Sequence, residues 1–288
     1  MRKFYYRHLL VILSLLVVPT LTACLAVRNI SGDIHGQHIW RGIVYVDGDV
    51  ELSAGSLLRI LPGTEVVFLP PRPGQRSAHP FFHGSELIVR GRLIAEGTAS
   101  EPIVFRSIKS NAPPGAWGSV NLTESPYASF RFCRFKQADS AIHSQQSREV
   151  YIRESVFEDN LVAIRFHSTP IIIENNLIQH NGAGIRFHFD APVINRNLIV
   201  DNEKGIFITA HPREYQIKNN HFARNNTHVV LGEEVAEDVD LTLNYWDSPN
   251  LPGAALFFDK NRSSYLGTVQ LLPLLRQADP STGPSWNR

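Results

Sequence analysis

Apolar residues recur along the second half of this chain about every 21 to 23 residues, at three positions of each repeat. The first position holds Phe130, Ile152, Ile173, Ile194, Ile217 and Leu241; the second holds Phe135, Phe157, Ile178, Ile199, Phe222 and Trp246; the third holds Ile142, Ile164, Ile185, Ile206 and Val229. Most of these residues are β-branched or aromatic and alternate with polar residues, which is typical of short β-strands. The pattern therefore predicts three short strands per repeat.

Asparagine marks one corner of these repeats. The corner position holds Asn176, Asn197, Asn220 and Asn244, and Ser155 and Cys133 continue the line toward the N-terminus. An asparagine amide can bond to the asparagines above and below it, and asparagine tolerates the left-handed backbone conformation that a sharp corner needs. Such a period indicates a solenoid whose repeats bury their apolar faces against their neighbours. We expect parallel strands stacked about 4.8 Å apart, and not helices, because Gly, Asn and Pro fall at the corners.

These repeats resemble the right-handed parallel β-helix repeat family, which is related in fold to pectate lyases and to periplasmic β-helix proteins of nitrous oxide reductase maturation. The first half is similar to the opening coils of secreted bacterial β-helix proteins at Val46–Val50, Leu58–Phe68, Gly91–Thr98, Glu101–Phe105 and Trp117–Val120, and Asn244-Tyr245-Trp246 resembles their closing coil. The resemblance covers residues 39–272. It implies an all-β fold, a right-handed parallel β-helix of about ten coils.

The N-terminus has the pattern of a secretory signal. Basic residues within the first seven positions precede the apolar run Leu9–Val18, which is too short to span a membrane comfortably. Leu21-Thr22-Ala23-Cys24 resembles a bacterial lipobox, which implies cleavage before Cys24 and lipidation of its sulfur. Leu25, in place of an aspartate, favours transfer to the outer membrane. The alternative is an ordinary signal peptide with a chance cysteine.

The sequence divides the chain into four predicted segments. We predict a signal peptide over residues 1–23, a lipidated tether over 24–38, the β-helix over 39–272 and a loosely held tail over 273–288. Residues 70–80 are too rich in proline for a central strand, and we expect a projecting loop there.

The charge of the chain limits which ligands are expected, and its cysteine content limits which disulfide bonds can form. Lys and Arg number 28 and Asp and Glu 27, a formal net charge of +1, so no general attraction to nucleic acid is expected. The chain has two cysteines. If Cys24 carries lipid, then Cys133 has no disulfide partner, and its place in the corner line favours a small buried thiol over a reactive one.

One outward-facing strand surface gathers basic residues. His143, Arg165 and Arg186 fall in one column, followed by Phe207 and Val230; Gln145, His167, His188, Thr209 and Gly232 fall in the next, with Asp190 and His211 at the margin. Neighbours in such a column lie about 5 Å apart. Because guanidinium groups bind carboxylates through two contacts and histidine donates or accepts, we predict a surface for an anionic or hydroxyl-rich ligand.

Several functions are compatible with this surface. It can be a solvated strand face, a polysaccharide-binding face or a catalytic face. A pectate-lyase-like mechanism needs a calcium cluster of several carboxylates, and here Asp190 is nearly the only acid. We therefore favour a non-catalytic binding or scaffold module. The alternatives are a polysaccharide lyase or hydrolase, and a periplasmic maturation or assembly factor with a protein partner.

A second column holds Asp159, His180 and Asp201, one per repeat. Two carboxylates and an imidazole at this spacing can hold a divalent metal or act as an acid–base set, but they can also pair with one another as a surface ladder. No sequence motif for another cofactor appears.

Overall fold

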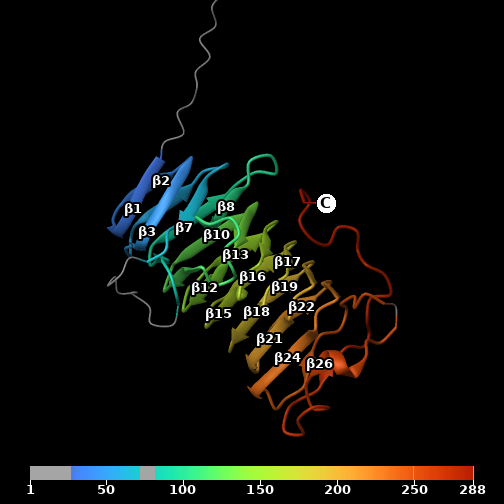
Figure 1. Cartoon of the computed structure of the whole chain (residues 1–288). Helices are drawn as coiled ribbons and strands as arrows, with labels where there is room; N and C mark the ends of the chain where they lie inside the picture. Colours follow the sequence, from blue (N-terminus) through green and yellow to red (C-terminus); the bar gives the residue numbers. More distant parts are fainter. Residues whose placement is uncertain (1–26, 72–81, 249, 288) are drawn as a thin grey trace, which may run out of the picture.

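The computed structural model describes residues 27–71, 82–248 and 250–287. The chain winds into an elongated rod whose coils follow one another from the N-terminal to the C-terminal end (Figure 1). Every strand pairing is parallel, and each regular coil contributes one strand to each of three faces. The predicted parallel β-helix with three strands per coil is confirmed.

The first face is a separate sheet, and the second and third faces belong to one continuous sheet. The first face comprises β2 (Gln37–Trp40), β4 (Leu57–Ile60), β7 (Arg92–Glu96), β10 (Tyr127–Arg131), β13 (Val150–Arg153), β16 (Ile171–Glu174), β19 (Val193–Asn195) and β22 (Gln216–Lys218). The second comprises β5 (Glu65–Phe68), β8 (Ile103–Ser107), β11 (Cys133–Lys136), β14 (Val156–Glu158), β17 (Leu177–Gln179), β20 (Leu198–Val200) and β23 (His221–Ala223). The third comprises β6 (Leu87–Val89), β9 (Trp117–Thr123), β12 (Ala138–Gln145), β15 (Val162–His167), β18 (Ala183–His188), β21 (Lys204–Ala210), β24 (Thr227–Glu234) and β26 (Phe257–Phe258).

The two ends of the rod depart from this regular coil. At the N-terminal end, β1 (Val27–Ile34) pairs with β3 (Ile43–Leu52), and β3 runs across the second and third faces without a break. Strand β1 and the first two residues of β2 lie within residues 24–38, which were predicted as a tether, and both strands pair with strands of the β-helix. At the other end, β25 (Val239–Asp240) pairs with β27 (Val269–Gln270), and the short 3-10 helix η1 (Ala254–Leu256) contacts β24. No helix among the described residues is long and apolar enough to cross a membrane.

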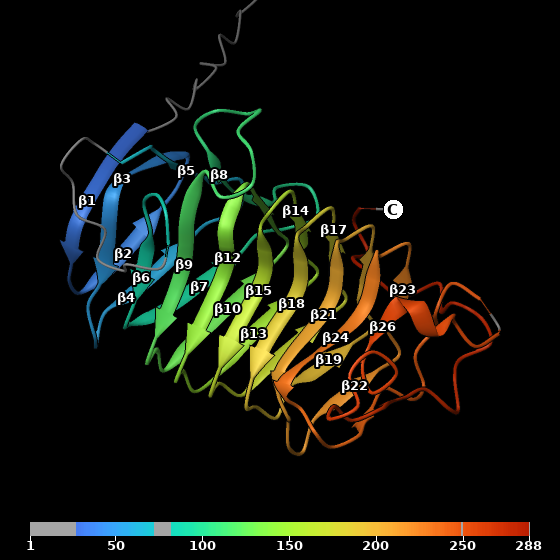
Figure 2. The same ribbon diagram turned by 60° about the horizontal axis from the view of Figure 1, so that its bottom comes forward.

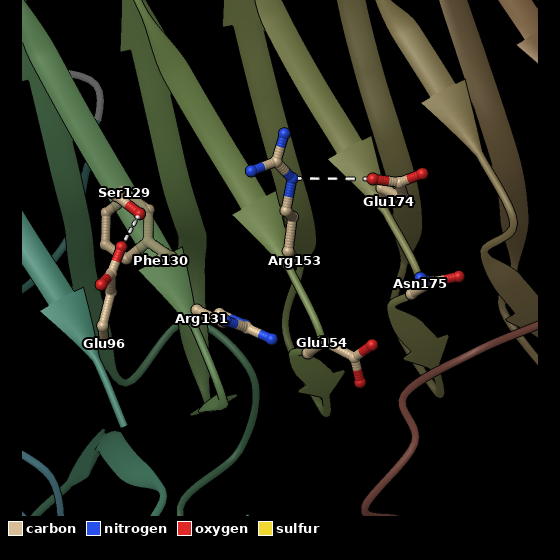
Figure 3. A pocket seen from close by; sticks show the side chains of 8 residues that line it. All are labelled: Glu96, Ser129, Phe130, Arg131, Arg153, Glu154, Glu174 and Asn175. Carbon is tan, nitrogen blue, oxygen red and sulfur yellow. Dashed lines mark hydrogen bonds and ion pairs between the residues drawn. The ribbon is translucent and has the colours of Figure 1, made fainter. Parts of the chain in front are cut away.

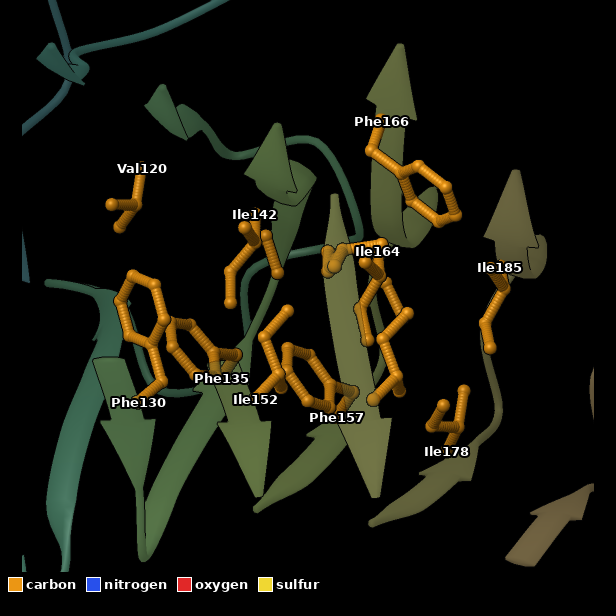
Figure 4. Close-up of a cluster of buried hydrophobic side chains, with 14 of the residues drawn as sticks. Val120, Phe130, Phe135, Ile142, Ile152, Phe157, Ile164, Phe166, Ile178 and Ile185 are labelled. Carbon is orange, nitrogen blue, oxygen red and sulfur yellow. The ribbon is translucent and has the colours of Figure 1, made fainter. Parts of the chain in front are cut away.

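The apolar columns predicted from the repeat form the core. Phe157 pairs in register with Phe135 on one side and Ile178 on the other, and all three side chains are fully buried. The rings of Phe135 and Phe157 are nearly parallel, with centroids 4.8 Å apart. Figure 4 shows these side chains stacked along the inside of the rod. Each coil thus buries its apolar residues against the coils before and after it, as a solenoid requires.

The predicted asparagine ladder is present at the corner between the first and second faces. The Asn176 backbone N–H and side-chain amide both donate to Oδ1 of Asn197, at 3.0 and 2.9 Å. The Ser155 N–H donates to Oδ1 of Asn176, and the Cys133 N–H donates to the Ser155 hydroxyl, so both continue the ladder as predicted. A second ladder at the next corner joins Asn160, Asn181, Asn202 and Asn225 in the same way.

The left-handed backbone conformation lies one residue earlier than predicted. Asn175, with φ of 53°, precedes the ladder residue Asn176, and His180, with φ of 56°, precedes Asn181. The ladder asparagines themselves do not have positive φ. The backbone therefore turns at the preceding residue, and the ladder position selects asparagine for its amide, which is buried and needs both a donor and an acceptor.

The C-terminal segment packs against the rod, whereas its composition predicted a loosely held tail. Trp286 packs against an apolar cluster on the outside of the second face, which comprises Val156, Leu177, Val200 and Ala223. Its indole N–H donates to the Glu154 carbonyl at 2.6 Å, and the Gly283 N–H donates to the Arg196 carbonyl at 2.9 Å. These two hydrogen bonds join residues 132 and 87 positions apart in the chain, so no local sequence pattern predicts them.

Candidate functional site

The basic surface predicted from the repeat lies on the outer side of the third face. Strands β12, β15, β18 and β21 run side by side there (Figure 2). His143 pairs in register with Arg165 and Arg165 with Arg186, which brings the three side chains onto consecutive coils. His167 and His188 are likewise in register one column further along. The structure thus places these five residues together, as the repeat spacing predicted.

The surface is hollowed between these side chains. The hollow has a volume of about 270 Å³ and is lined by His143, Arg165, Phe166, His167, Arg186, Phe187, His188 and Thr209. We call it the arginine hollow. Cation and imidazole groups line its outward side, and Phe166 and Phe187 stack beneath it with ring centroids 5.0 Å apart. The buried phenylalanine pair fixes the two strands that carry the arginines.

The two arginines of the hollow are not held in ion pairs, although Asp139 lies close enough to Arg165 to favour its charge. Neither Arg165 nor Arg186 forms an ion pair with any described residue. By contrast, six other arginines each lie within 4.0 Å of a carboxylate: Arg90, Arg106, Arg134, Arg153, Arg196 and Arg224. The guanidinium of Arg165 lies 5.7 Å from the centre of the Phe82 ring, and that of Arg186 lies 5.0 Å from the Phe207 ring. These aromatic contacts orient the cations without neutralising them.

The electrostatic environment of Arg165 is unfavourable to its charge. Burial, and second the neighbouring Arg186, lower the pKa of Arg165, and Asp139 opposes them with a smaller effect. Its Nε atom is also buried without a hydrogen-bond partner. Because two cations on adjacent coils repel each other and one is half-buried, a bound anion would stabilise the pair.

The histidines are held by specific hydrogen bonds. Nδ1 of His188 lies 3.1 Å from the Thr209 hydroxyl, and that hydroxyl donates its own proton to the Phe187 carbonyl at 2.8 Å. The Thr209 oxygen therefore accepts from His188, so Nδ1 carries the proton and Nε2 is the acceptor of the neutral ring. The His167 and His188 rings lie 5.4 Å apart. In this state Nε2 of His188 can accept a hydrogen bond from a ligand hydroxyl group.

A hydrogen-bonded chain leads from the hollow to a buried acid. Nδ1 of His143 donates to Oδ1 of Asn121 at 3.1 Å, and the Asn121 amide donates to Oε2 of Glu86 at 3.0 Å. Glu86 is fully buried. Burial raises the pKa of Glu86 to about 8, with smaller contributions from Asp49 and Asp139, and the Asn121 hydrogen bond acts in the opposite direction.

Sequence reasoning missed Glu86 and Asn121. Asn121 is in register with His143 on the preceding coil, so extending the His143, Arg165 and Arg186 column by one coil toward the N-terminus would have identified it. Glu86 lies beyond the long connection between β5 and β6, where the repeat period is broken.

Asp190, predicted at the margin of the basic surface, is part of a corner ladder. Its Oδ1 accepts the Thr169 N–H at 2.6 Å and ends a third corner ladder that begins at Ser125 and passes through Ser147. Burial raises the pKa of Asp190 to about 7. It lines, with His211, a separate hollow of about 280 Å³ beside the arginine hollow. The Asp190 carboxylate therefore accepts a backbone hydrogen bond at a corner of the coil.

The predicted metal candidates do not converge on one point. Asp159, His180 and Asp201 occupy successive left-handed corner positions, and the Asp201 carboxylate is held by Arg224 through two bonds of 2.8 and 2.7 Å. The described part of the chain contains no group of three or more His, Cys, Asp or Glu side chains placed to hold a metal ion. Cys133 is buried in its ladder, where burial raises the pKa of the thiol. Cys24 and most of the predicted loop over residues 70–80 lie outside the described residues.

Comparison with known proteins agrees with the architecture. Residues 103–239, from β8 to the start of β25, match the family model described as right handed beta helix region. The resemblance stated from the repeats is thereby confirmed, including the hand of the coil. Searches of curated proteins and of solved structures gave no match.

Proposed function

The chain is a right-handed parallel β-helix protein, and on this basis we propose that it is a non-catalytic binding module for an acidic polysaccharide, which it holds in the arginine hollow. The observation that carries this proposal is that Arg165 and Arg186 lie in register on consecutive coils and neither forms an ion pair with a described residue. In a chain with almost equal numbers of acidic and basic residues, two half-buried arginines side by side on consecutive coils, neither in an ion pair with a described residue, support an anionic ligand.

The chemistry of the hollow suits a carboxylated sugar polymer. A guanidinium group binds a carboxylate through two parallel hydrogen bonds, which fixes orientation as well as charge. Successive coils repeat about every 4.8 Å, so Arg165 and Arg186 present cations at a regular spacing to a ligand with regularly spaced carboxylates. His167 and His188 add groups that donate to or accept from sugar hydroxyls.

The location proposed for this module is the bacterial cell envelope. The lipobox-like sequence ending at Cys24 supports an outer-membrane lipoprotein, in which the lipid on Cys24 holds the rod at the membrane. Labelling of growing cells with palmitate tests this proposal. The protein should incorporate label and a Cys24→Ala variant should not; an unlabelled wild-type protein would exclude the lipid anchor.

The binding proposal is tested with an array of acidic and neutral glycans. We expect wild-type protein to bind carboxylated glycans and an Arg165→Ala, Arg186→Ala double variant to lose at least about 10-fold in affinity. An Arg92→Ala, Arg148→Ala variant is the matched control, since it removes the same charge from two exposed arginines outside the hollow. Equal binding signals from the wild type and the Arg165→Ala, Arg186→Ala variant would show that the arginine hollow does not bind the glycan.

A polysaccharide lyase is the second candidate, and one observation favours it. The chain from Glu86 through Asn121 orients the His143 imidazole beside Arg165. In a lyase reaction a base removes the proton next to a uronate carboxylate, the bond to the neighbouring sugar oxygen breaks, and a carbon–carbon double bond forms. Absorbance from unsaturated products, present with wild type and absent with His143→Ala, would establish this activity and overturn the non-catalytic proposal.

A further inference from the structure

The outward column of the third face changes from basic to apolar one coil after the arginine hollow. Arg186 is in register with Phe207, Phe207 with Val230, and Val230 with Phe258, so each step moves one coil toward the C-terminal end. The strands that carry these residues, β21, β24 and β26, continue the row formed by β12, β15 and β18 (Figure 2). We call Phe207, Val230 and Phe258 the apolar strip.

The apolar strip lies on the outside of the rod. Both chain neighbours of each member are buried: Ile206, Ile208, Val229, Leu231, Phe257 and Asp259. Because successive side chains point to opposite sides of a strand, the strip residues point away from the core. Phe207 and Val230 are half-buried, and Phe258 is 44% exposed. Three consecutive coils, about 4.8 Å apart, thus present apolar side chains at the surface.

The strip is one side chain wide. The nearest half-buried positions on β21 and β24 hold only polar residues and glycine: Lys204, Thr209, Thr227 and Gly232. None of these four is acidic, and the first acids along β24, Glu233 and Glu234, come after Gly232. The shape is therefore a narrow line along the rod axis, which suits an extended alkyl chain better than a bulky apolar group.

The apolar strip begins directly beside a cation of the arginine hollow. The guanidinium of Arg186 lies 5.0 Å from the centre of the Phe207 ring. A ligand whose anionic group pairs with Arg186 therefore has apolar surface next to it on the C-terminal side. The complementary ligand is anionic at one end and apolar at the other.

The outer side of the first face is arranged differently. There residues of opposite charge lie in register, Arg131 with Glu96 and Arg153 with Glu174 (Figure 3). Nε of Arg153 lies 3.6 Å from the Glu174 carboxylate. Charges on the first face are thus balanced by their neighbours, whereas on the third face two consecutive arginines are followed by apolar residues.

We propose that the apolar strip is the second half of the binding site, and that the acidic glycan bound in the arginine hollow carries an alkyl chain at one end. This inference rests on the function proposed for the arginine hollow. The sugar carboxylate pairs with Arg165 and Arg186, and the alkyl chain lies along the strip, where both lose contact with water. A glycan without the chain leaves the strip uncovered, and a simple fatty acid leaves His167 and His188 without hydroxyl groups to bind.

The test compares octyl glucuronide with methyl glucuronide by isothermal titration calorimetry, with the octyl compound kept below the concentration at which it forms micelles. The two ligands share one carboxylate and differ only in the length of the alkyl chain. Each fully buried methylene strengthens binding about fourfold. Because the strip is open to solvent and buries the chain only in part, we expect the octyl compound to bind at least about 10-fold more tightly.

A Val230→Thr, Phe258→Thr variant isolates the strip, since it changes neither arginine and threonine retains the preference for strands. It should reduce the octyl-to-methyl ratio below about 3-fold and leave the affinity for methyl glucuronide within about 2-fold. The matched control is an Ile39→Thr, Ile108→Thr variant, which alters two apolar side chains, 53% and 43% exposed, outside the third face. That control should keep the wild-type ratio.

The outcomes separate this inference from the function proposed for the arginine hollow. Equal affinity of the wild type for the two glucuronides, or the wild-type ratio in the strip variant, overturns the strip and leaves the hollow in place. The same loss in the control variant also overturns it, because the chain would then bind apolar surface in general. No binding of either glucuronide contradicts the function proposed for the hollow, and this inference falls with it.

Two further measurements complete the test. Octyl glucoside, which lacks the carboxylate, should bind at least about 10-fold more weakly than octyl glucuronide, and equal affinity for the two would overturn the coupling between strip and hollow. Circular dichroism and the thermal midpoint establish that each variant folds. If the double variant has a lower midpoint, Phe258→Thr alone is compared, and an unchanged octyl-to-methyl ratio in that variant also overturns the strip.

Discussion

Each corner of the coil is made by two neighbouring residues with separate tasks. The first adopts the left-handed backbone conformation, as Asn175 does, and the second turns a buried polar side chain toward the next coil, as Asn176 does. The first position accepts many residue types, including Leu243 with φ of 58°. The second position needs a small group that satisfies buried backbone atoms. Asp190 is the charged exception among these ladder residues.

An Asp190→Asn substitution should stabilise the protein at pH 8 and have little effect at pH 4. The pKa of Asp190 rises from 3.8 to about 7 through burial, so between these values the folded protein retains a proton that the unfolded chain releases. The stability this proton provides is complete below about pH 4 and is lost as the pH rises toward 7. Asparagine keeps the Thr169 bond without a charge, so we expect a gain of about 1–3 kcal/mol at pH 8.

Urea unfolding at the two pH values measures this difference. Asp33→Asn is the control, because Asp33 is exposed in β1 and should change the free energy of unfolding by less than about 0.5 kcal/mol at either pH. A gain from Asp190→Asn of the same size at pH 4 and pH 8 would contradict the assigned origin of the effect.

At the scale of elements, side-chain ladders join strands that would be marginal alone. Asn181 accepts the Asn160 N–H at 3.0 Å and donates to the Phe157 carbonyl at 3.2 Å and to Oδ1 of Asn202 at 3.0 Å. One side chain thus links three successive coils. Strands of three residues, such as β17, depend on such links because they bury little surface by themselves.

An Asn181→Ala substitution should therefore lower the free energy of unfolding by about 2–4 kcal/mol, since it leaves several buried groups without partners. Gln179→Ala is the matched control, because Gln179 is half-buried on the outside of β17, two residues before Asn181. Its side chain makes one long hydrogen bond of 3.4 Å to Glu158. Chemical denaturation of both variants makes the comparison. Similar losses of unfolding free energy in the Asn181→Ala and Gln179→Ala variants would show that the asparagine ladder does not contribute the predicted stability.

The sequence predicted the regular elements well and the end elements poorly, for a physical reason. Columns such as Phe157 and Ile178 repeat because in-register stacking requires the same residue class at the same position. Strand β1 pairs through its backbone at the end of the stack, where Arg28 and Asn29 are exposed, so its hydrophobic pattern is weak. The docking of Trp286 beside Glu154 joins segments 132 residues apart and follows no period.

The faces of the rod differ in how their charges are balanced. On the first face Arg153 has Glu174 beside it on the next strand. On the third face no acidic residue separates Arg165 from Arg186. A formal net charge of +1 for the whole chain therefore conceals a local excess of positive charge.

The candidate site was predictable in part. The repeat period predicted that Arg165, Arg186 and His188 lie together, because residues one period apart become neighbours on adjacent coils. It did not reveal that neither arginine forms an ion pair with a described residue, which depends on side chains from every adjoining element. Nor did it reveal Glu86, because the connection before β6 breaks the period.

The most direct test of the arginine hollow is calorimetric titration of the protein with polygalacturonate at low and high salt. Binding by the wild type should weaken as salt is raised, because the contacts are ionic and partly exposed. The Arg165→Ala, Arg186→Ala variant should fold normally and lose both the affinity and its salt dependence. Wild-type affinity and salt dependence in that variant, or no binding by the wild type, would contradict the account.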